Sequence, residues 1–209
     1  MIKLSDISIV AFDCDGVLFD TEAANRAYYN TILSLMGMPE MTEEQFFYAQ
    51  MHTVDAALEF LCGRENLERA HYYRRQSGYL PFIKHMKKAP FLEDLLNRLN
   101  GHCHTAIATN RSNTMNRVLE EHGLAGRFEL VVTALDVMRP KPAPEQLLKI
   151  LDHFQASPAA MIYIGDSELD QAAAASAEVP FIAFNNSALA ADFHVTDMRQ
   201  LGTVLGLDG

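Results

Sequence analysis

The segment Ile7-Ser8-Ile9-Val10-Ala11-Phe12-Asp13-Cys14-Asp15-Gly16-Val17 joins a short, mostly apolar run to two acidic residues. A run of this kind is typical of a strand buried on both faces of a parallel sheet. In extended backbone, residues two apart point to the same side, so Asp13 and Asp15 can reach one point in space. Neighbouring carboxylates resist ionising together unless a cation or a shared proton relieves their repulsion. The segment therefore indicates a metal site, an acid/base pair, or both.

Further apolar or β-branched runs follow along the chain, and helical patterns separate them. The strands expected after the first are Thr105–Ala108, Glu129–Thr133, Met161–Ile164, Phe181–Phe184 and a weaker one at His194-Val195. The helices expected between them are Leu92–Leu99, Ser112–His122, Glu145–Phe154 and Glu168–Ala177. Strands that alternate with helices in this way predict an α/β fold with a Rossmann-like parallel sheet core.

One long interval, residues 20–88, interrupts this alternation with helical patterns and no convincing strand. We expect an α/β core domain of residues 1–19 and 89–209, into which residues 20–88 are inserted as an α-helical domain. Pro and Gly residues supply the breaks between its helices. The helices expected in the insertion are Glu22–Met36, Glu43–Gln50, Val54–Cys62 and Asn66–Gln76.

The composition is that of a globular protein, with 49% apolar and 21% charged residues. The net charge of −10 argues against nucleic acid as a partner, because binding to the phosphate backbone needs a basic surface. Three widely spaced cysteines without a CxxC pair fit free thiols in a reducing compartment. No apolar stretch has the length of a membrane span. We expect a cytoplasmic protein with no membrane partner and favour a monomer, although the sequence leaves the oligomeric state open.

Polar residues follow four of the expected strands at the point where each strand ends. In open parallel sheets, ligand sites form beyond the carboxyl ends of the strands. We therefore expect these side chains to meet in one crevice. The residues concerned are Asp13 and Asp15 after the first strand, Thr109 and Asn110 after the second, Lys141 after the third, and Asp166 and Asp170 after the fourth.

In order and spacing, these residues resemble the four motifs of the haloacid dehalogenase-like (HAD) superfamily. Asp13–Leu18 is similar to the first motif, Thr109 to the second, Lys141 to the third, and Gly165-Asp166-Ser167-x-x-Asp170 to the fourth. The stretch Asp15–Glu22 looks closest to the branch that holds sugar phosphatases, phosphoglycolate phosphatases and β-phosphoglucomutases. The helical insertion is similar to the small α-helical cap of that superfamily.

The resemblance implies a Mg²⁺-dependent phosphatase that hydrolyses a small phosphomonoester, a sugar phosphate, phosphoglycolate or a similar metabolite, through an aspartyl-phosphate. Asp13 would be the nucleophile. Asp15 would protonate the leaving group and then activate the water that hydrolyses the intermediate. Mg²⁺, a hard cation that prefers oxygen, would lie between Asp13, the backbone carbonyl of Asp15 and Asp166.

Four further assignments complete the implied site. The Thr109 hydroxyl and the Lys141 ammonium would hold the phosphoryl oxygens as charge redistributes. Asn110 either donates to the phosphate or is a turn residue. For Asp170 three roles stay open: a metal contact through water, orientation of Lys141, or an acid that is favourable in the first turn of a helix.

Two alternative functions remain. A phosphomutase of the β-phosphoglucomutase type would carry a His in its first cap helix, where an ungapped alignment places Asn25. A signalling module such as a receiver domain would take phosphate on an Asp after a later strand and would lack the helical insertion. A non-catalytic phosphate-binding protein with the HAD fold would be expected to have lost Asp13, Asp15 or Lys141, and all three are present. Finally, Arg64–Lys88 holds seven Lys or Arg against two Glu, which is either a solvated face or an attraction for an anionic substrate through Arg69, Arg74, Arg75 or Lys84.

Overall fold

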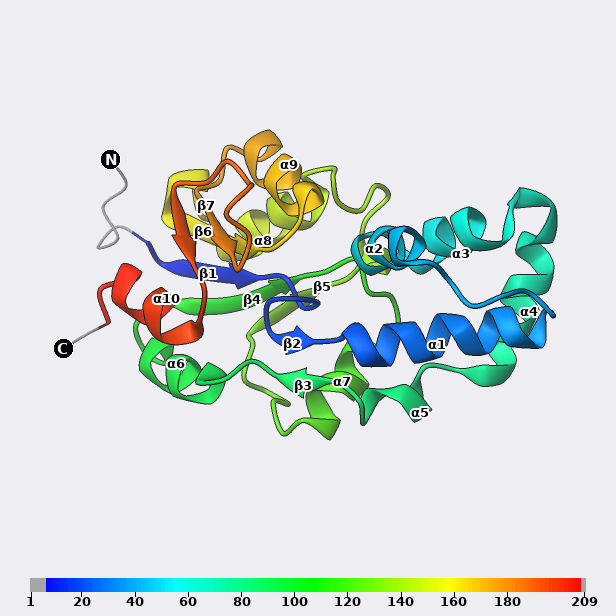
Figure 1. Cartoon of the computed structure of the whole chain (residues 1–209). Helices are drawn as coiled ribbons and strands as arrows, with labels where there is room; N and C mark the ends of the chain where they lie inside the picture. Colours follow the sequence, from blue (N-terminus) through cyan, green and yellow to red (C-terminus); the bar gives the residue numbers. More distant parts are fainter. Residues whose placement is uncertain (1–6, 208–209) are drawn as a thin grey trace.

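The central sheet has six parallel strands in the order β5-β4-β1-β6-β7-β8 (Figure 1). The computed structural model describes residues 7–207, so residues 1–6 and 208–209 of the expected core domain lie outside it. The strands are β1 Ile9–Phe12, β4 His104–Ala108, β5 Leu130–Val132, β6 Met161–Gly165, β7 Phe181–Phe184 and β8 Phe193–Val195. This arrangement confirms the expected α/β fold. Within residues 7–207, no helix combines the length and apolar character that crossing a membrane requires.

Helices cover both faces of this sheet, which explains why its strands read as continuous apolar runs. Val10 and Phe12 pack on the side of α6, α7 and α10, whereas Ile9 and Ala11 pack on the side of α8 and α9. All four side chains are fully buried. In Figure 1, α8 and α9 lie on one side of the strands and α6 and α10 on the other. These helices are α6 Leu92–Leu99, α7 Met115–Glu121, α8 Glu145–Phe154, α9 Glu168–Ser176 and α10 Met198–Val204.

Five further helices, which we call the helical unit, lie between β2 and β3 and extend away from the sheet (Figure 1). The two strands, Phe19–Asp20 and Lys87–Lys88, pair antiparallel where the chain leaves and re-enters the sheet layer. We expected no strand within residues 20–88, and the pair was missed because two residues are too few to show a strand period. The helices are α1 Glu22–Leu35, α2 Glu43–Met51, α3 Val54–Cys62, α4 Leu67–Ser77 and α5 Leu80–Ile83.

Other differences from the expected elements are small, and the largest concerns α7. It begins at Met115 rather than Ser112, because Arg111 hydrogen-bonds to Asp15 and Thr114 and keeps the preceding segment irregular. The short α5 was not expected. The Asp20 side chain accepts from the backbone N–H of Glu22, the first residue of α1, at 3.2 Å. Short 3₁₀ turns also occur at Arg64–Asn66, Ala134–Asp136 and Pro158–Ala160.

Candidate active site

A pocket of about 530 Å³ lies between the carboxyl ends of the sheet strands and the helical unit. Six of the residues expected in one crevice line it, and Asp170 lies directly behind, bonded to Lys141. All five helices of the helical unit contribute lining residues, and Tyr79 in the segment before α5 does so too. The six expected residues that line it are Asp13, Asp15, Thr109, Asn110, Lys141 and Asp166.

Four side chains form a buried group that we call the lysine cluster: Asp13 and Lys141, which line the pocket, and Tyr163 and Asp170, which are not among the lining residues. Lys141 Nζ donates to Asp13 Oδ1 and to Asp170 Oδ1, both at 2.7 Å. It is also 2.9 Å from the Tyr163 hydroxyl and 3.1 Å from the carbonyl oxygen of Ala108. The Lys141 side chain is only 3% exposed. The two carboxylates raise the pKa of Lys141 above its ordinary range, although burial alone would lower it. The two carboxylates therefore favour the charged ammonium and hold it in place.

Asp170 accepts hydrogen bonds on both carboxylate oxygens. Its Oδ1 accepts from Lys141 and from Tyr163, each at 2.7 Å. Its Oδ2 accepts from the backbone N–H and the hydroxyl of Ser167, in a capping box that begins α9. Burial tends to raise the pKa of Asp170, but Lys141 and these hydrogen bonds lower it. A carboxylate has about four acceptor positions, so these contacts favour orientation of Lys141 among the roles left open for Asp170.

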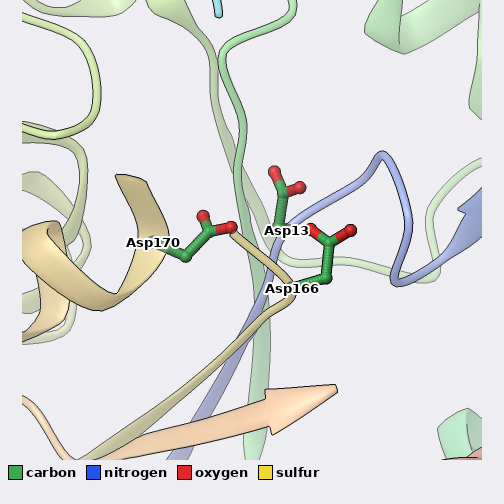
Figure 2. Close-up of side chains that lie close together, drawn as sticks. All are labelled: Asp13, Asp166 and Asp170. Carbon is green, nitrogen blue, oxygen red and sulfur yellow. The ribbon is translucent and has the colours of Figure 1, made fainter. Parts of the chain in front are cut away.

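The oxygens of Asp13, Asp166 and Asp170 lie within 4.8 Å of one another (Figure 2). Burial raises the pKa of Asp13 to about 7, in spite of Lys141 and with a further contribution from the Asp170 and Asp15 charges. Burial and the Asp13 carboxylate also raise the pKa of Asp166 well above its ordinary value. A divalent cation would relieve this repulsion, and carboxylate oxygen is the ligand that Mg²⁺ prefers.

The backbone beside Asp166 leaves room for this carboxylate only because residue 16 is a glycine. A Cβ at Gly16 would overlap the Asp166 carboxylate, and its φ of +81° also favours glycine. The Asp166 side chain thus lies directly against the backbone that follows Asp15. The cluster of Asp13, Asp166 and Asp170 could hold a metal ion, and its all-oxygen donor set is of the kind that hard divalent cations take.

Thr109 and Asn110 form the wall of the pocket at the end of β4. The Thr109 hydroxyl oxygen accepts from the backbone N–H of Arg111 at 3.2 Å, which leaves its hydrogen to donate to another acceptor. Gln146, a fully buried residue that the sequence analysis missed, donates to the Thr109 carbonyl at 2.6 Å and fixes the turn. The Asn110 side-chain amide donates to the Lys141 carbonyl at 3.1 Å, so it braces the loop that carries Lys141.

A second charged group, which we call the arginine cluster, joins the sheet side of the pocket to the helical unit. It consists of Asp15, Arg111, Tyr79, Asn25 and Gln50. Arg111 contacts Asp15 through two parallel hydrogen bonds, Nε to Oδ2 at 2.7 Å and Nη2 to Oδ1 at 2.8 Å. The side chains are 7% and 14% exposed. Asp15 raises the pKa of Arg111 although burial opposes this, so the guanidinium stays charged.

The contacts of the arginine cluster continue into the helical unit. Arg111 Nη2 donates to the Tyr79 hydroxyl at 3.0 Å, and the guanidinium lies 4.8 Å from the centre of the Tyr79 ring. Tyr79 in turn donates to Asn25, whose amide donates to Gln50 at 2.8 Å. Arg111 was not among the expected site residues, although it directly follows Thr109-Asn110 at a strand end. Because nothing in a sequence shows which cation meets Asp15, this ion pair was not predictable.

The positive charge of the insertion reaches the pocket in part. Arg74 and Arg75 line it, while Arg69 and Lys84 are not among the described residues that do so. Arg74 is paired with Asp55 on α3 at 3.2 Å, and Arg75 is exposed. The attraction for an anionic substrate therefore remains a prediction for these two arginines. Cys14, between the two acids, is fully buried in the core.

Comparisons with known proteins bear on this site. Residues 10–184 match the family model described as haloacid dehalogenase-like hydrolase. The phosphoglycolate phosphatase of Escherichia coli strain K12 is 27% identical, with 87% of this chain and 82% of that protein covered. The crystal structure of a HAD-superfamily hydrolase, subfamily IA, from Geobacter sulfurreducens has a TM-score of 0.84 and is 33% identical, over 95% of this chain and 99% of that one.

The fold is shared more widely than the sequence. A β-phosphoglucomutase from Clostridium difficile superposes with a TM-score of 0.82 at 20% identity, and 96% of each chain is covered. At this identity the likeness concerns the fold alone. The family match, in contrast, spans most of the described residues and includes the four strand ends that line the pocket. The chain belongs to the haloacid dehalogenase-like hydrolase family.

Proposed function

We propose that this protein is a Mg²⁺-dependent phosphatase that hydrolyses a small phosphomonoester through an aspartyl-phosphate on Asp13. The observation that carries the proposal is the buried Lys141–Asp13 contact at the pocket wall, at 2.7 Å. It fixes a carboxylate beside a cation, as nucleophilic attack on a dianionic phosphate requires. Relatives named phosphoglycolate phosphatase make phosphoglycolate the first candidate substrate.

In the first step, Asp13 attacks phosphorus and forms a new P–O bond to one of its carboxylate oxygens. Lys141 donates to Oδ1, so Oδ2 is the oxygen that we assign to the attack. The P–O bond to the substrate alcohol breaks, and the proton that the leaving oxygen needs comes from Asp15. The Thr109 hydroxyl and the Lys141 ammonium hold the phosphoryl oxygens throughout.

In the second step, Asp15 takes a proton from a water molecule as that water attacks the phosphorus. The bond between phosphorus and the Asp13 oxygen breaks, which releases inorganic phosphate and restores the carboxylate. When bound by Asp13 and Asp166, and by the Asp15 carbonyl that the family resemblance implies, Mg²⁺ would supply charge neutralisation between the anionic nucleophile and the anionic substrate. Asp170 holds Lys141 in our assignment, since its oxygens are already engaged.

We also propose that residues 20–88 act as a cap over residues 7–19 and 89–207. The pocket lies between the two parts, and Tyr79, Arg74 and Arg75 of the helical unit line it. A cap that closes on a pocket of about 530 Å³ excludes water and selects small metabolites over macromolecules. The three free cysteines are typical of a reducing compartment, and we propose that the protein acts on such a metabolite in the cytoplasm.

The test is release of inorganic phosphate from a panel of small phosphomonoesters, with Mg²⁺ and with a chelator. We expect release from at least one ester and its loss in the chelator. Conversion of a sugar phosphate to its positional isomer without release would instead identify a mutase. A folded protein that binds the esters but turns none of them over would contradict the proposal and favour a binding module.

A further inference from the structure

Asp15, to which the proposed function gives the acid/base role, has both carboxylate oxygens occupied by Arg111. The pair is bidentate, at 2.7 and 2.8 Å, and both side chains are largely buried. Asn25 adds a longer contact to Oδ1 at 3.4 Å. In this arrangement the guanidinium takes two of the roughly four acceptor positions of the carboxylate, and movement of Asp15 away from Arg111 would free both oxygens for a leaving group or a water.

Separating this pair has a cost that only certain ligands can offset. A buried guanidinium left without its carboxylate is strongly unfavourable. The Tyr79 hydroxyl, 3.0 Å from Nη2, is neutral and cannot replace the lost charge. An incoming carboxylate or phosphate can replace it, because both match the two-pronged geometry of a guanidinium. A neutral hydroxyl on a substrate does not.

We propose that Arg111 is the specificity-determining residue for a second anionic group on the substrate, which takes the place of Asp15 on the guanidinium. The reacting phosphate lies at Asp13 and Lys141, so Arg111 receives the far end of the same molecule. Binding of that end releases Asp15 toward the leaving group. The inference rests on the proposed phosphatase function and adds to it a substrate class: small phosphomonoesters that carry a carboxylate or a second phosphate.

The surroundings of Arg111 agree with an anionic ligand. Arg74 and Arg75 of the helical unit line the same pocket; Arg74 is paired with Asp55, and Arg75 is exposed. Arg75 therefore offers a further positive charge beside the space that such a ligand would enter. Arg111 also contacts Tyr79, so replacement of Asp15 by a ligand would change the surroundings of a residue of the helical unit.

The test compares two esters of nearly equal size. 2-Phosphoglycolate carries a carboxylate where 2-hydroxyethyl phosphate carries a neutral CH₂OH group. Ethylene glycol bisphosphate is the third arm and distinguishes a second phosphate from a carboxylate as the preferred anion. For the wild type we expect kcat/KM for the better anionic ester to exceed that for the neutral ester by about 100-fold. In Arg111→Met the ratio should fall to within about threefold of unity.

Arg117→Met is the matched control, because Arg117 lies on α7 with its side chain 52% exposed and pairs with Glu120 and Glu121. It should keep the wild-type ratio. Arg111→Lys preserves the charge but loses the two-pronged contact, and we expect an intermediate ratio. If thermal unfolding shows that Arg111→Met does not fold, the kcat/KM ratios of Arg111→Lys and of the wild type together test the role of Arg111.

A wild type that hydrolyses the anionic and neutral esters equally well would overturn the inference and leave the proposed function intact. So would an Arg111→Met variant that lowers both rates by one common factor, since that is the mark of a purely structural role. If the wild type hydrolyses no ester, the phosphatase proposal fails, and calorimetry on Asp13→Asn still tests the inference. There, 2-phosphoglycolate should bind about 100-fold more tightly than 2-hydroxyethyl phosphate, and equal binding would contradict it.

Discussion

The lysine cluster and the arginine cluster meet the same pocket, yet they are built differently. Every member of the lysine cluster comes from the sheet layer: Asp13 after β1, Lys141 before α8, Tyr163 on β6 and Asp170 on α9. The arginine cluster takes Asp15 and Arg111 from that layer, and its remaining members come from the helical unit. Only the second cluster can change when the helical unit moves.

The difference suggests that the two clusters have separate roles in one site, one in the reaction and one in selection of the substrate. A nucleophile and its cation need fixed positions, because small displacements cost large factors in rate. Selection of a substrate benefits from contacts that rearrange when the correct ligand arrives. The fixed lysine cluster suits the first task, and the arginine cluster, shared between two parts of the chain, suits the second. The predictions below separate the two.

Asp13→Asn should have the largest effect on turnover. The amide is nearly the same size and still accepts a hydrogen bond from Lys141 but is not a nucleophile, so we expect phosphate release to fall by at least about 10³-fold. Phosphate release and thermal unfolding of the same preparation measure the two properties separately. Asp152→Asn, an exposed position on α8, is the control. Substantial turnover by Asp13→Asn would remove Asp13 from the chemistry.

Lys141→Met should have the largest effect on folding. It leaves the buried carboxylates of Asp13 and Asp170 without their cation, which costs about 3–5 kcal/mol in the free energy of unfolding. Urea denaturation measures it, with Lys149→Met at an exposed position of α8 as the control. The deficit should be smaller at pH 5 than at pH 8, since protonation at low pH removes the unpaired charge. A deficit equal to that of Lys149→Met would show that the cluster contributes nothing to stability.

Mg²⁺ should stabilise the protein more at pH 8 than at pH 5. The pKa of Asp13 is about 7 in the folded protein against 3.8 as its ordinary value, so folding becomes less favourable as the pH rises between these values. A cation relieves that cost only where the carboxylate is ionised. At pH 8 and a free concentration about 100 times Kd, the gain is about 2.7 kcal/mol.

The rise in Tm with added Mg²⁺, measured at both pH values, checks this prediction. Asp166→Asn should weaken the response and raise the Mg²⁺ concentration needed for half-maximal activity by about tenfold or more. Glu168→Gln, an exposed acid on α9, should leave both unchanged. If Asp166→Asn responds to Mg²⁺ as the wild type does, Asp166 is not a ligand.

Tyr79→Phe should have the smallest effect and should act on the arginine cluster alone. It removes one hydroxyl between Arg111 and Asn25, at a cost of about 1 kcal/mol in the free energy of unfolding. We expect KM to change by less than about tenfold with kcat nearly constant, because the lysine cluster is untouched. Steady-state kinetics decides it. A large loss in kcat would show that the two clusters are not independent.

The sequence predicted the lysine cluster better than the arginine cluster, for physical reasons. Asp13 directly follows the buried strand β1, and Lys141 lies in the segment between β5 and α8. In a parallel sheet, topology brings the segments that follow the strands to the same edge. Arg111 also follows a strand, but its pairing with Asp15 depends on the irregular segment before α7 and on the placement of Tyr79. The antiparallel pair of β2 and β3 and the buried Tyr163 hydroxyl likewise leave no periodic pattern in the chain.

The central claim, a covalent step at Asp13, is tested most directly by quenching the wild type in acid during turnover of a phosphate-labelled ester. An acyl phosphate survives acid and is cleaved by hydroxylamine. Our account predicts one labelled phosphoryl group per molecule at most, sensitive to hydroxylamine, on the peptide that carries Asp13, and none in Asp13→Asn. Continued phosphate release with no labelled protein, or with the label on another residue, would contradict it.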